Sequence, residues 1–187
     1  MTIAFNEVPA NLRVPGVYIE INGAGAAAGL GDQPYRILMF GQRTTAGTVA
    51  ANVPTRVRSA AEAAKYFGVG SMIHGMVKAS VANNRQIETM VIAMADPGAG
   101  VAATATISFA VTTPTPGTLN FHVAGQRVQV GVTSSSTDET LATATAAAIN
   151  AETSLPVTAE VNGSDATQVD LTCRHKGTIG NEIDLRV

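Results

Sequence analysis

Hydrophobic and polar residues alternate near the start of the chain. Val17, Ile19 and Ile21 alternate with polar neighbours after a stretch that contains Pro9 and Pro15. Each proline lacks a backbone donor and pushes the preceding residue toward extended geometry, and the alternation is typical of a half-buried strand. No hairpin partner lies beside this segment in the sequence. We therefore expect an extended arm that adds a strand to the sheet of another chain.

The next part of the chain has two nearly continuous apolar runs, residues 35–41 and 89–94, which enclose two helix patterns. Continuous apolar runs favour strands covered on both faces, as in a parallel sheet. Ser59 followed by Glu62 predicts a capping box for the first helix, and Ser71 caps the second. The order strand, helix, helix, strand predicts a right-handed crossover. Two strands are too few for a stable sheet, so we expect this α/β layer to be partial.

The pattern changes after residues 96–100 to short segments in which apolar and polar residues alternate. Ala124-Gly125 predicts a hairpin turn, and Ser136 with Glu139 predicts the start of a helix. The apolar face expected for that helix consists of Leu141, Ala144, Ala148 and Ile149. Strands are expected over residues 105–111, 119–123, 128–132, 157–161, 169–173 and 183–187.

These patterns predict a mixed α+β chain in three parts. An extended N-terminal arm with a Gly/Ala hinge occupies residues 1–31, the partial α/β layer residues 32–97, and a β-rich, sandwich-like module with one helix residues 98–187. The expected hinge glycines are Gly23, Gly25, Gly29 and Gly31. Their spacing only superficially resembles a dinucleotide fingerprint, because that motif needs a fully buried strand before it and a helix after it. Here the preceding strand alternates and Pro34 blocks a long helix.

Composition narrows the classes of function. The chain has 187 residues, 45% of them hydrophobic, 4% aromatic and 14% charged, with a formal net charge of −2. Basic residues form no cluster of the kind that binds nucleic acid, and no apolar run is long enough to span a bilayer. The lone Cys173 excludes an intrachain disulfide framework. We therefore expect no direct nucleic-acid partner and no membrane insertion.

Candidate chemistry is sparse. The chain has no Walker pattern and no Gly-x-Ser-x-Gly elbow, and His74, His122 and His175 lack metal-ligand spacing. We expect no catalytic residue, no metal and no cofactor, and hence no enzyme. The helix pair after Ser59 lacks the basic reading helix of a DNA-binding motif. Several arginines stand out as solvated charges or as members of salt bridges between subunits: Arg13, Arg36, Arg43, Arg56 and Arg58.

Several segments together resemble a known family. The motif Arg13-Val14-Pro15-Gly16-Val17-Tyr18 is followed by Arg36-Ile37-Leu38-Met39-Phe40-Gly41-Gln42 and by Phe67-Gly68-Val69-Gly70-Ser71-Met72. Further matches are residues 155–159 and 176–186, in the same order. The chain is similar to the N-terminal portion of contractile phage tail sheath proteins of the Mu-like type.

This resemblance implies a structural function. Sheath subunits stack in six-fold helical rings around an inner tail tube and contract to drive the tube through the host envelope. The implied partners are neighbouring sheath subunits, the tube protein, the baseplate and the tail terminator, in a virion assembled in the host cytoplasm. The resemblance also implies a C-terminal sheath domain that is absent from this chain. The arm implied to join a neighbouring subunit comprises Phe5, Val8, Pro9, Arg13, Val14, Pro15, Gly16, Val17, Tyr18, Ile19, Glu20 and Ile21.

Two alternatives stay open at this point. A sheath from a phage-derived injection device, such as a tailocin, would have the same sequence features. A surface-exposed virion β module that binds a receptor or carbohydrate would need clustered exposed aromatics, yet Tyr18, Tyr35 and Tyr66 all lie outside the β-rich part.

Overall fold

The computed structural model describes residues 13–19 and 35–187. The chain divides into two units, Met1–Pro34 and Tyr35–Val187. In the first unit, residues 13–19 contain neither helix nor strand. All the helices and strands described below belong to the second unit.

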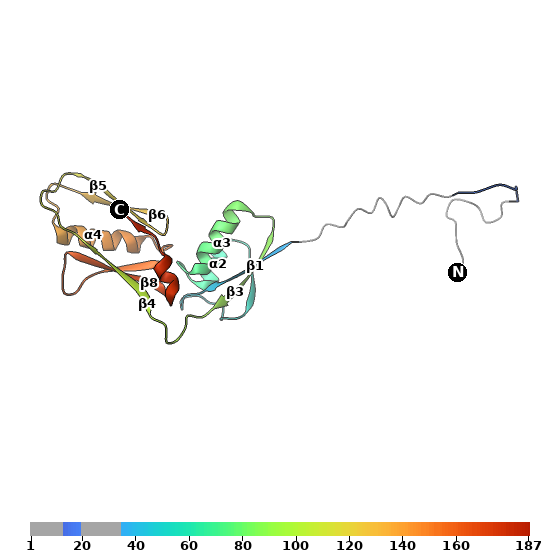
Figure 1. The fold of residues 1–187 in the computed structure, drawn as a ribbon, viewed down its shortest axis with the longest axis horizontal. Helices are drawn as coiled ribbons and strands as arrows, with labels where there is room; N and C mark the ends of the chain where they lie inside the picture. The colour runs from blue at the N-terminus through green and yellow to red at the C-terminus, as the bar shows by residue number, and fades with distance from the viewer. Residues whose placement is uncertain (1–12, 20–34) are drawn as a thin grey trace. The chain divides into compact units, whose positions relative to one another are not determined.

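The second unit begins with a small mixed sheet. Its strands β1 (Arg36–Gln42) and β3 (Glu88–Met94) run parallel, and β2 (Pro54–Val57) pairs antiparallel with the other edge of β3 (Figure 1). The sheet order is therefore β1-β3-β2. The predicted parallel pair is confirmed, and β2 is a short strand in the region between them.

Two helices connect β2 to β3. In α2 (Ala60–Phe67) the Ser59 hydroxyl accepts a hydrogen bond from the Glu62 N–H at 3.1 Å, as the sequence predicts. The Glu62 carboxylate, however, accepts from the N–H of Arg58 at 2.8 Å, one residue before the cap. In α3 (Met72–Asn83) the Ser71 hydroxyl accepts from the N–H of His74 at 3.1 Å. Both helices therefore begin at the residues that their capping signals indicate.

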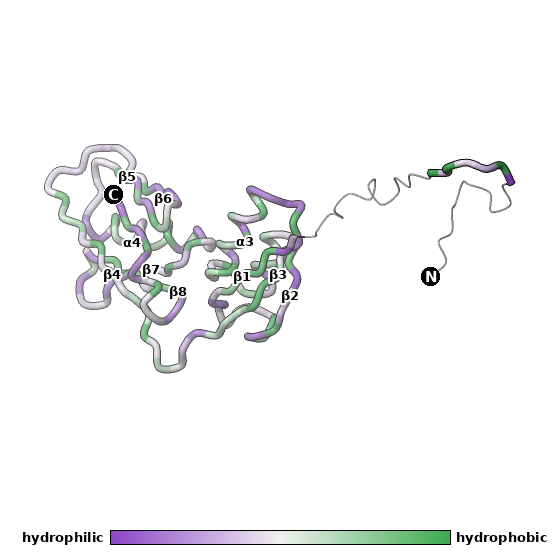
Figure 2. The backbone as a smooth tube through the Cα atoms, turned by 45° about the vertical axis from the view of Figure 1, so that its right-hand side comes forward, coloured by the Kyte–Doolittle hydropathy of each residue, from purple (hydrophilic) through white to green (hydrophobic). Residues whose placement is uncertain are grey.

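The helices cover one face of this sheet. Phe67, Ile73 and Val77 are fully buried against Met39 and Val91. In Figure 2 much of β1 and β3 carries the green of hydrophobic residues, since these two strands have apolar residues on both faces. We refer to residues 35–97 as the α/β layer.

Residues 98–187 form a β-sandwich, which encloses one helix, α4. The strands form two three-stranded sheets, with the orders β4-β8-β7 and β6-β5-β9. In chain order the elements are β4 (Ala102–Ser108), β5 (Gly117–Val123), β6 (Gln126–Val132), α4 (Asp138–Ala151), β7 (Val157–Val161), β8 (Gln168–Lys176), the 3-10 helix η1 (Thr178–Glu182) and β9 (Leu185–Arg186).

Local sequence explains the hairpin and the core of the sandwich. Ala124 and Gly125 both have positive φ, 51° and 74°, as a two-residue hairpin turn between β5 and β6 requires. The core lies between the two sheets, where Ile149 of α4 is buried with Phe121 of β5 and Leu171 of β8. The mixed fold class with a sandwich-like module is confirmed.

The start of α4 differs from the prediction. The N-cap is Thr137, whose hydroxyl accepts from the N–H of Thr140 while the Thr140 hydroxyl accepts from the N–H of Thr137. The Ser136 hydroxyl instead accepts from the N–H of Thr133 at 2.9 Å. Ala144 of the predicted apolar face is exposed. The residues that α4 buries are Leu141, Ala142, Thr145, Ala146 and Ile149.

Two predicted strands also differ in their bounds: one is shifted along the chain and the other is shorter than expected. The strand expected over residues 105–111 is β4, which begins earlier, at Ala102, and ends at Ser108; the N–H of Val111 donates to the Asp138 carboxylate at 2.7 Å. The strand expected over residues 183–187 is reduced to Leu185–Arg186, and the N–H of Ile183 donates to the carbonyl oxygen of Gly180 in η1 instead of to a strand.

Candidate functional site

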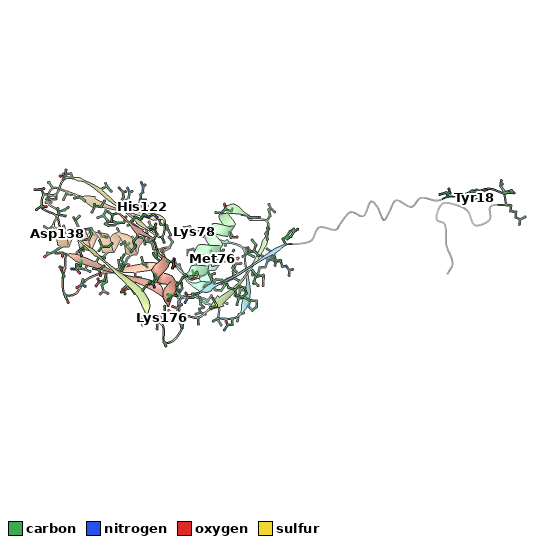
Figure 3. All side chains as sticks on the ribbon, in the orientation of Figure 1. Tyr18, Met76, Lys78, His122, Asp138 and Lys176 are labelled. Atoms are coloured by element: carbon green, nitrogen blue, oxygen red, sulfur yellow. The ribbon has the colours of Figure 1, made fainter. Side chains whose placement is uncertain are left out.

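The described part of the arm exposes its apolar side chains. Val17 is 90% exposed and Ile19 is 79% exposed. The Tyr18 hydroxyl, labelled in Figure 3, donates to the carbonyl oxygen of Val14 at 2.8 Å. Residues 13–19 form no backbone–backbone hydrogen bond with one another. Residues 13–19 contain no strand, and pairing of the arm with another subunit stays a prediction.

The remaining arm and hinge residues lie outside the described part of the chain. They are Phe5, Val8, Pro9, Glu20, Ile21, Gly23, Gly25, Gly29 and Gly31.

The α/β layer has an uncovered apolar face. Leu38 and Phe40 alternate with the buried Met39 and Gly41 along β1, and they are 53% and 52% exposed. Met94 of β3 is also exposed on the strand beside it. The prediction that β1 is covered on both faces is therefore wrong for the described residues, because the only helices of the layer, α2 and α3, lie on its other face.

A group of charges borders this face at the start of β1. Glu88 is half-buried, and its carboxylate lies 2.9 Å from the guanidinium of Arg36 and 2.9 Å from that of Arg56. One carboxylate is shared by two guanidinium groups, so this end of the layer stays positively charged. Both arginines are among those that the sequence marked as salt-bridge candidates, and their partner lies within the same chain.

A buried histidine joins the sandwich to the α/β layer. The side chain of His175 on β8 is 3% exposed. Its Nε2 accepts a hydrogen bond from the backbone N–H of Met72, and its Nδ1 lies 3.1 Å from Oδ1 of Asp96. Since Nε2 must be unprotonated to accept, Nδ1 carries the proton and donates to Asp96. Oδ2 of Asp96 also accepts from the N–H of Lys176 at 3.1 Å. We call these contacts the His175 joint.

A second contact lies beside the His175 joint. The guanidinium Nε of Arg174 donates to the carbonyl oxygen of Leu155 at 2.8 Å. A Cβ placed on Gly70, in the turn between α2 and α3, would lie 2.8 Å from both of these atoms. Gly70 also has a φ of +74°. The close approach and the left-handed conformation together explain why glycine occupies this position.

His74 is neutral for a structural reason. It is buried in α3, and its Nδ1 accepts from the N–H of Gly70 at 3.3 Å. Burial lowers the pKa of His74 below its ordinary value of 6.5, and the positive charge of Lys78 lowers it further. This histidine therefore stabilises the turn before α3 as an uncharged acceptor.

The other candidate groups lie apart. Cys173 is a buried core residue on β8, and His122 is exposed on β5 (Figure 3). Within residues 13–19 and 35–187, no three His, Cys, Asp or Glu side chains gather in a way that could hold a metal ion. None of the helices in that part of the chain is both long enough and apolar enough to cross a membrane.

Three structural features thus stand out. They are the exposed arm, the uncovered apolar face of the α/β layer, and the hydrogen bonds that connect the sandwich to that layer. Such features define a structural module that is built to be covered by other protein surfaces. Comparison with known proteins agrees with this class. Residues 98–185 match the family described as phage tail sheath protein beta-sandwich domain.

The whole chain also matches a curated relative. It is 36% identical over 186 residues to the Mu-like prophage FluMu tail sheath protein of Haemophilus influenzae (strain ATCC 51907 / DSM 11121 / KW20 / Rd). The match covers 100% of this chain and 38% of that protein, so the chain spans well under half of the relative's length. The chain is thus similar to a tail sheath protein along its whole length, and residues 98–185 match the beta-sandwich domain of the phage tail sheath family. The resemblance seen in the sequence is thereby confirmed, and the family is one of structural proteins, not enzymes.

The His175 joint was not foreseen from the sequence. His175 and Asp96 are 79 residues apart, and nothing in either local pattern indicates that they meet. One signal was present: a histidine on the apolar face of an alternating strand, at the position that continues Val169, Leu171 and Cys173, must be buried and must therefore find partners.

Proposed function

We propose that this chain is part of a structural subunit of a contractile tail sheath. The subunit polymerises around a tail tube in six-fold helical rings and contracts to drive the tube through the host envelope. Its partners are neighbouring sheath subunits, the inner tube protein, the baseplate and the tail terminator, and assembly takes place in the host cytoplasm. Similarity to the sheath family supports the proposal that the subunit polymerises, since a sheath forms by self-assembly.

The exposed arm is the basis of the proposed linkage between neighbouring subunits. Val17 and Ile19 are apolar and expose most of their surface, and each would stabilise an assembly by roughly 1.5–3 kcal/mol if fully buried. Adding residues 17–21 to the edge of a neighbouring subunit's sheet would bury those side chains and would also satisfy the backbone groups. The arm thus links neighbouring subunits by a strand that stays bound while the folded remainder of each subunit, its body, moves.

A hinge between arm and body would let the bodies rotate during contraction. Gly23, Gly25, Gly29 and Gly31 supply the required backbone freedom in the sequence. Replacing them with proline or bulky residues should block assembly or contraction, and normal contractile particles from that variant would refute the hinge.

The open face of the α/β layer supports a further part of the proposal. Leu38 and Phe40 expose an apolar surface that a larger α/β sheath domain would cover. The matched relative contains 62% of its length outside the region that this chain matches, which is enough for such a domain. In this account residues 32–97 are one portion of a composite domain, and residues 98–187 are a separate sandwich.

Electron microscopy of the full-length protein tests the proposal. We expect the wild type to form tubes or striated sleeves, and the double variant Val17→Asp/Ile19→Asp to remain dispersed, because two carboxylates cannot be buried in a sheet without partners. A matched control, Val69→Asp/Val101→Asp, places the same changes at exposed positions of the body. Tubes from the arm variant that match those of the wild type would contradict the proposal.

A receptor- or carbohydrate-binding β module remains the second candidate in principle. The three tyrosines lie at positions 18, 35 and 66, outside the sandwich, and its only aromatic side chains other than histidine, Phe109 and Phe121, pack edge to face in the core. No observation on the described residues favours this alternative.

A further inference from the structure

The two parts of the unit Tyr35–Val187 carry opposite net charge. Residues 35–97 contain seven Lys and Arg against three Asp and Glu, a net charge of +4. Residues 98–187 contain four Lys and Arg against eight Asp and Glu, a net charge of −4. The charges of these two parts thus cancel within the small net charge of the whole chain.

Three of these seven basic residues line a hollow in the α/β layer. The hollow has a volume of about 270 Å³, and Arg56, Arg58 and Arg85 line it together with Glu88. Arg58 and Arg85 are exposed, and neither has an ion-pair partner among the described residues. The carboxylate of Glu88 is already shared by Arg36 and Arg56. The hollow therefore offers two uncompensated guanidinium groups, which suit a carboxylate in bidentate geometry. We call it the arginine hollow.

The negative charge includes a like-charged pair on the sandwich. On the outer face of the sheet β4-β8-β7, Glu160 lies directly opposite Asp170. Like charges in this position destabilise a sheet. The hydrogen-bond partners of Asp170 are neutral, the Thr106 hydroxyl at 2.8 Å and the Asn162 amide at 2.7 Å.

Both carboxylates border an open hollow of about 480 Å³, which is otherwise lined by small and polar residues such as Thr172. Among the described residues, Glu160 has no ion-pair partner. We call this surface the acidic face. A cation delivered from outside would relieve the repulsion between its two carboxylates.

We propose that the arginine hollow of one copy of this protein docks on the acidic face of another copy. The inference rests on the proposed function, since it assumes that the subunits polymerise. An open-ended helical assembly needs heterologous contacts, in which two different surfaces of the same chain meet. The arginine hollow and the acidic face are two such surfaces, and their charges are complementary.

Charge reversal in the full-length protein tests this contact. The variants are Arg58→Glu/Arg85→Glu in the arginine hollow, Glu160→Arg/Thr172→Arg on the acidic face, and all four changes combined. We expect each double variant to raise the critical concentration for assembly by about tenfold or more, and the combined variant to recover most of that loss. The control Lys65→Glu/Lys78→Glu reverses two exposed cations outside the hollow and should change the critical concentration by less than about twofold (Figure 3 labels Lys78).

A salt titration keeps the test decisive if a reversal variant fails to fold. Attraction between exposed charges is screened as the Debye length falls from about 10 Å at 0.1 M to about 3 Å at 1 M salt. The critical concentration of the wild type should therefore rise with salt, and that of the neutral variant Arg58→Gln/Arg85→Gln should rise less.

The outcomes separate this docking contact from the proposed function. A wild type that forms no polymer overturns both. Wild-type polymers with unchanged assembly of the folded reversal variants, or with equal salt dependence in the neutral variant, overturn the docking contact alone. Recovery in the combined variant supports it.

Discussion

Nε2 of His175 in β8 accepts a hydrogen bond of 2.9 Å from the backbone N–H of Met72, the first residue of α3. These residues are 103 positions apart and belong to different parts of the unit. The same imidazole donates to Asp96, in the segment between β3 and β4. One side chain therefore ties the sandwich both to a helix start and to the segment that connects the two parts. This joint therefore holds the sandwich and the α/β layer together.

Replacing His175 by alanine should destabilise the protein by roughly 2–3 kcal/mol, because the Met72 N–H and the Asp96 carboxylate each lose a buried partner. Denaturant titration measures the loss, and limited proteolysis should show faster cleavage between residues 95 and 101. His175→Gln should recover part of the stability, since an amide offers one donor and one acceptor. The exposed His122→Ala is the matched control. A His175→Ala variant as stable as that control would contradict the joint.

Stability should depend on pH through His74. Its pKa is lowered in the folded protein, so below about pH 6.5 the unfolded chain binds a proton that the folded chain does not. The contribution of His74 is thus complete above about pH 6.5 and is lost as the pH falls toward the folded pKa. Urea midpoints should decrease over that range, and NMR titration should report the lowered pKa. Because Lys78 contributes to the shift, Lys78→Gln should raise the pKa of His74 and flatten the slope. An unchanged slope and pKa in that variant would exclude Lys78 as a cause.

Gly70 and Gly75 should respond in opposite ways to alanine. At Gly70 an added Cβ would lie 2.8 Å from the Leu155 carbonyl oxygen in a left-handed conformation, so Gly70→Ala should cost about 2 kcal/mol or more. At Gly75, inside α3, an added Cβ would meet no atom within 4 Å, and Gly75→Ala should stabilise by about 0.5–1 kcal/mol. Thermal denaturation of both variants checks the contrast. Similar effects at the two positions would show that the turn is not closely packed.

Thr145 is fully buried in α4, and its hydroxyl has no hydrogen-bond partner among the described residues. Thr145→Val keeps the shape and removes the unsatisfied group, so it should stabilise the sandwich by about 1 kcal/mol. The control is Thr143→Val on the exposed side of the same helix, where the Thr143 hydroxyl donates to the carbonyl oxygen of Glu139. Calorimetry that shows Thr145→Val to be destabilising would mean that the hydroxyl has a partner in solution.

Signals from neighbouring residues predicted most of the helices and strands. Contacts between residues that are far apart in the sequence could not be predicted in this way. Ser59, Ser71 and the Ala124-Gly125 turn act through neighbouring backbone atoms, so their patterns are sufficient. The start of α4 was misplaced by one residue, because a Thr137–Thr140 pair competes with Ser136 and Glu139 for the same cap.

The exposure of Leu38 and the His175 joint could not be predicted in the same way. A continuous apolar run indicates that both faces of a strand can be buried, but it does not say by which segment. The partners of His175 lie far away in the sequence and are positioned only by the tertiary fold. The family resemblance depended on the order of several motifs along the chain, which does not require contacts to be known.

We propose that the arm acquires its strand partners from an adjacent subunit. Hydrogen exchange at the amides of Val17, Tyr18 and Ile19, compared between dispersed full-length protein and assembled sheaths, tests it most directly. We predict fast exchange in the dispersed protein and slowing by about a hundredfold or more at alternate amides after assembly, since an added strand pairs every second N–H with the neighbouring sheet. Equally fast exchange at all three amides in both states would contradict the account.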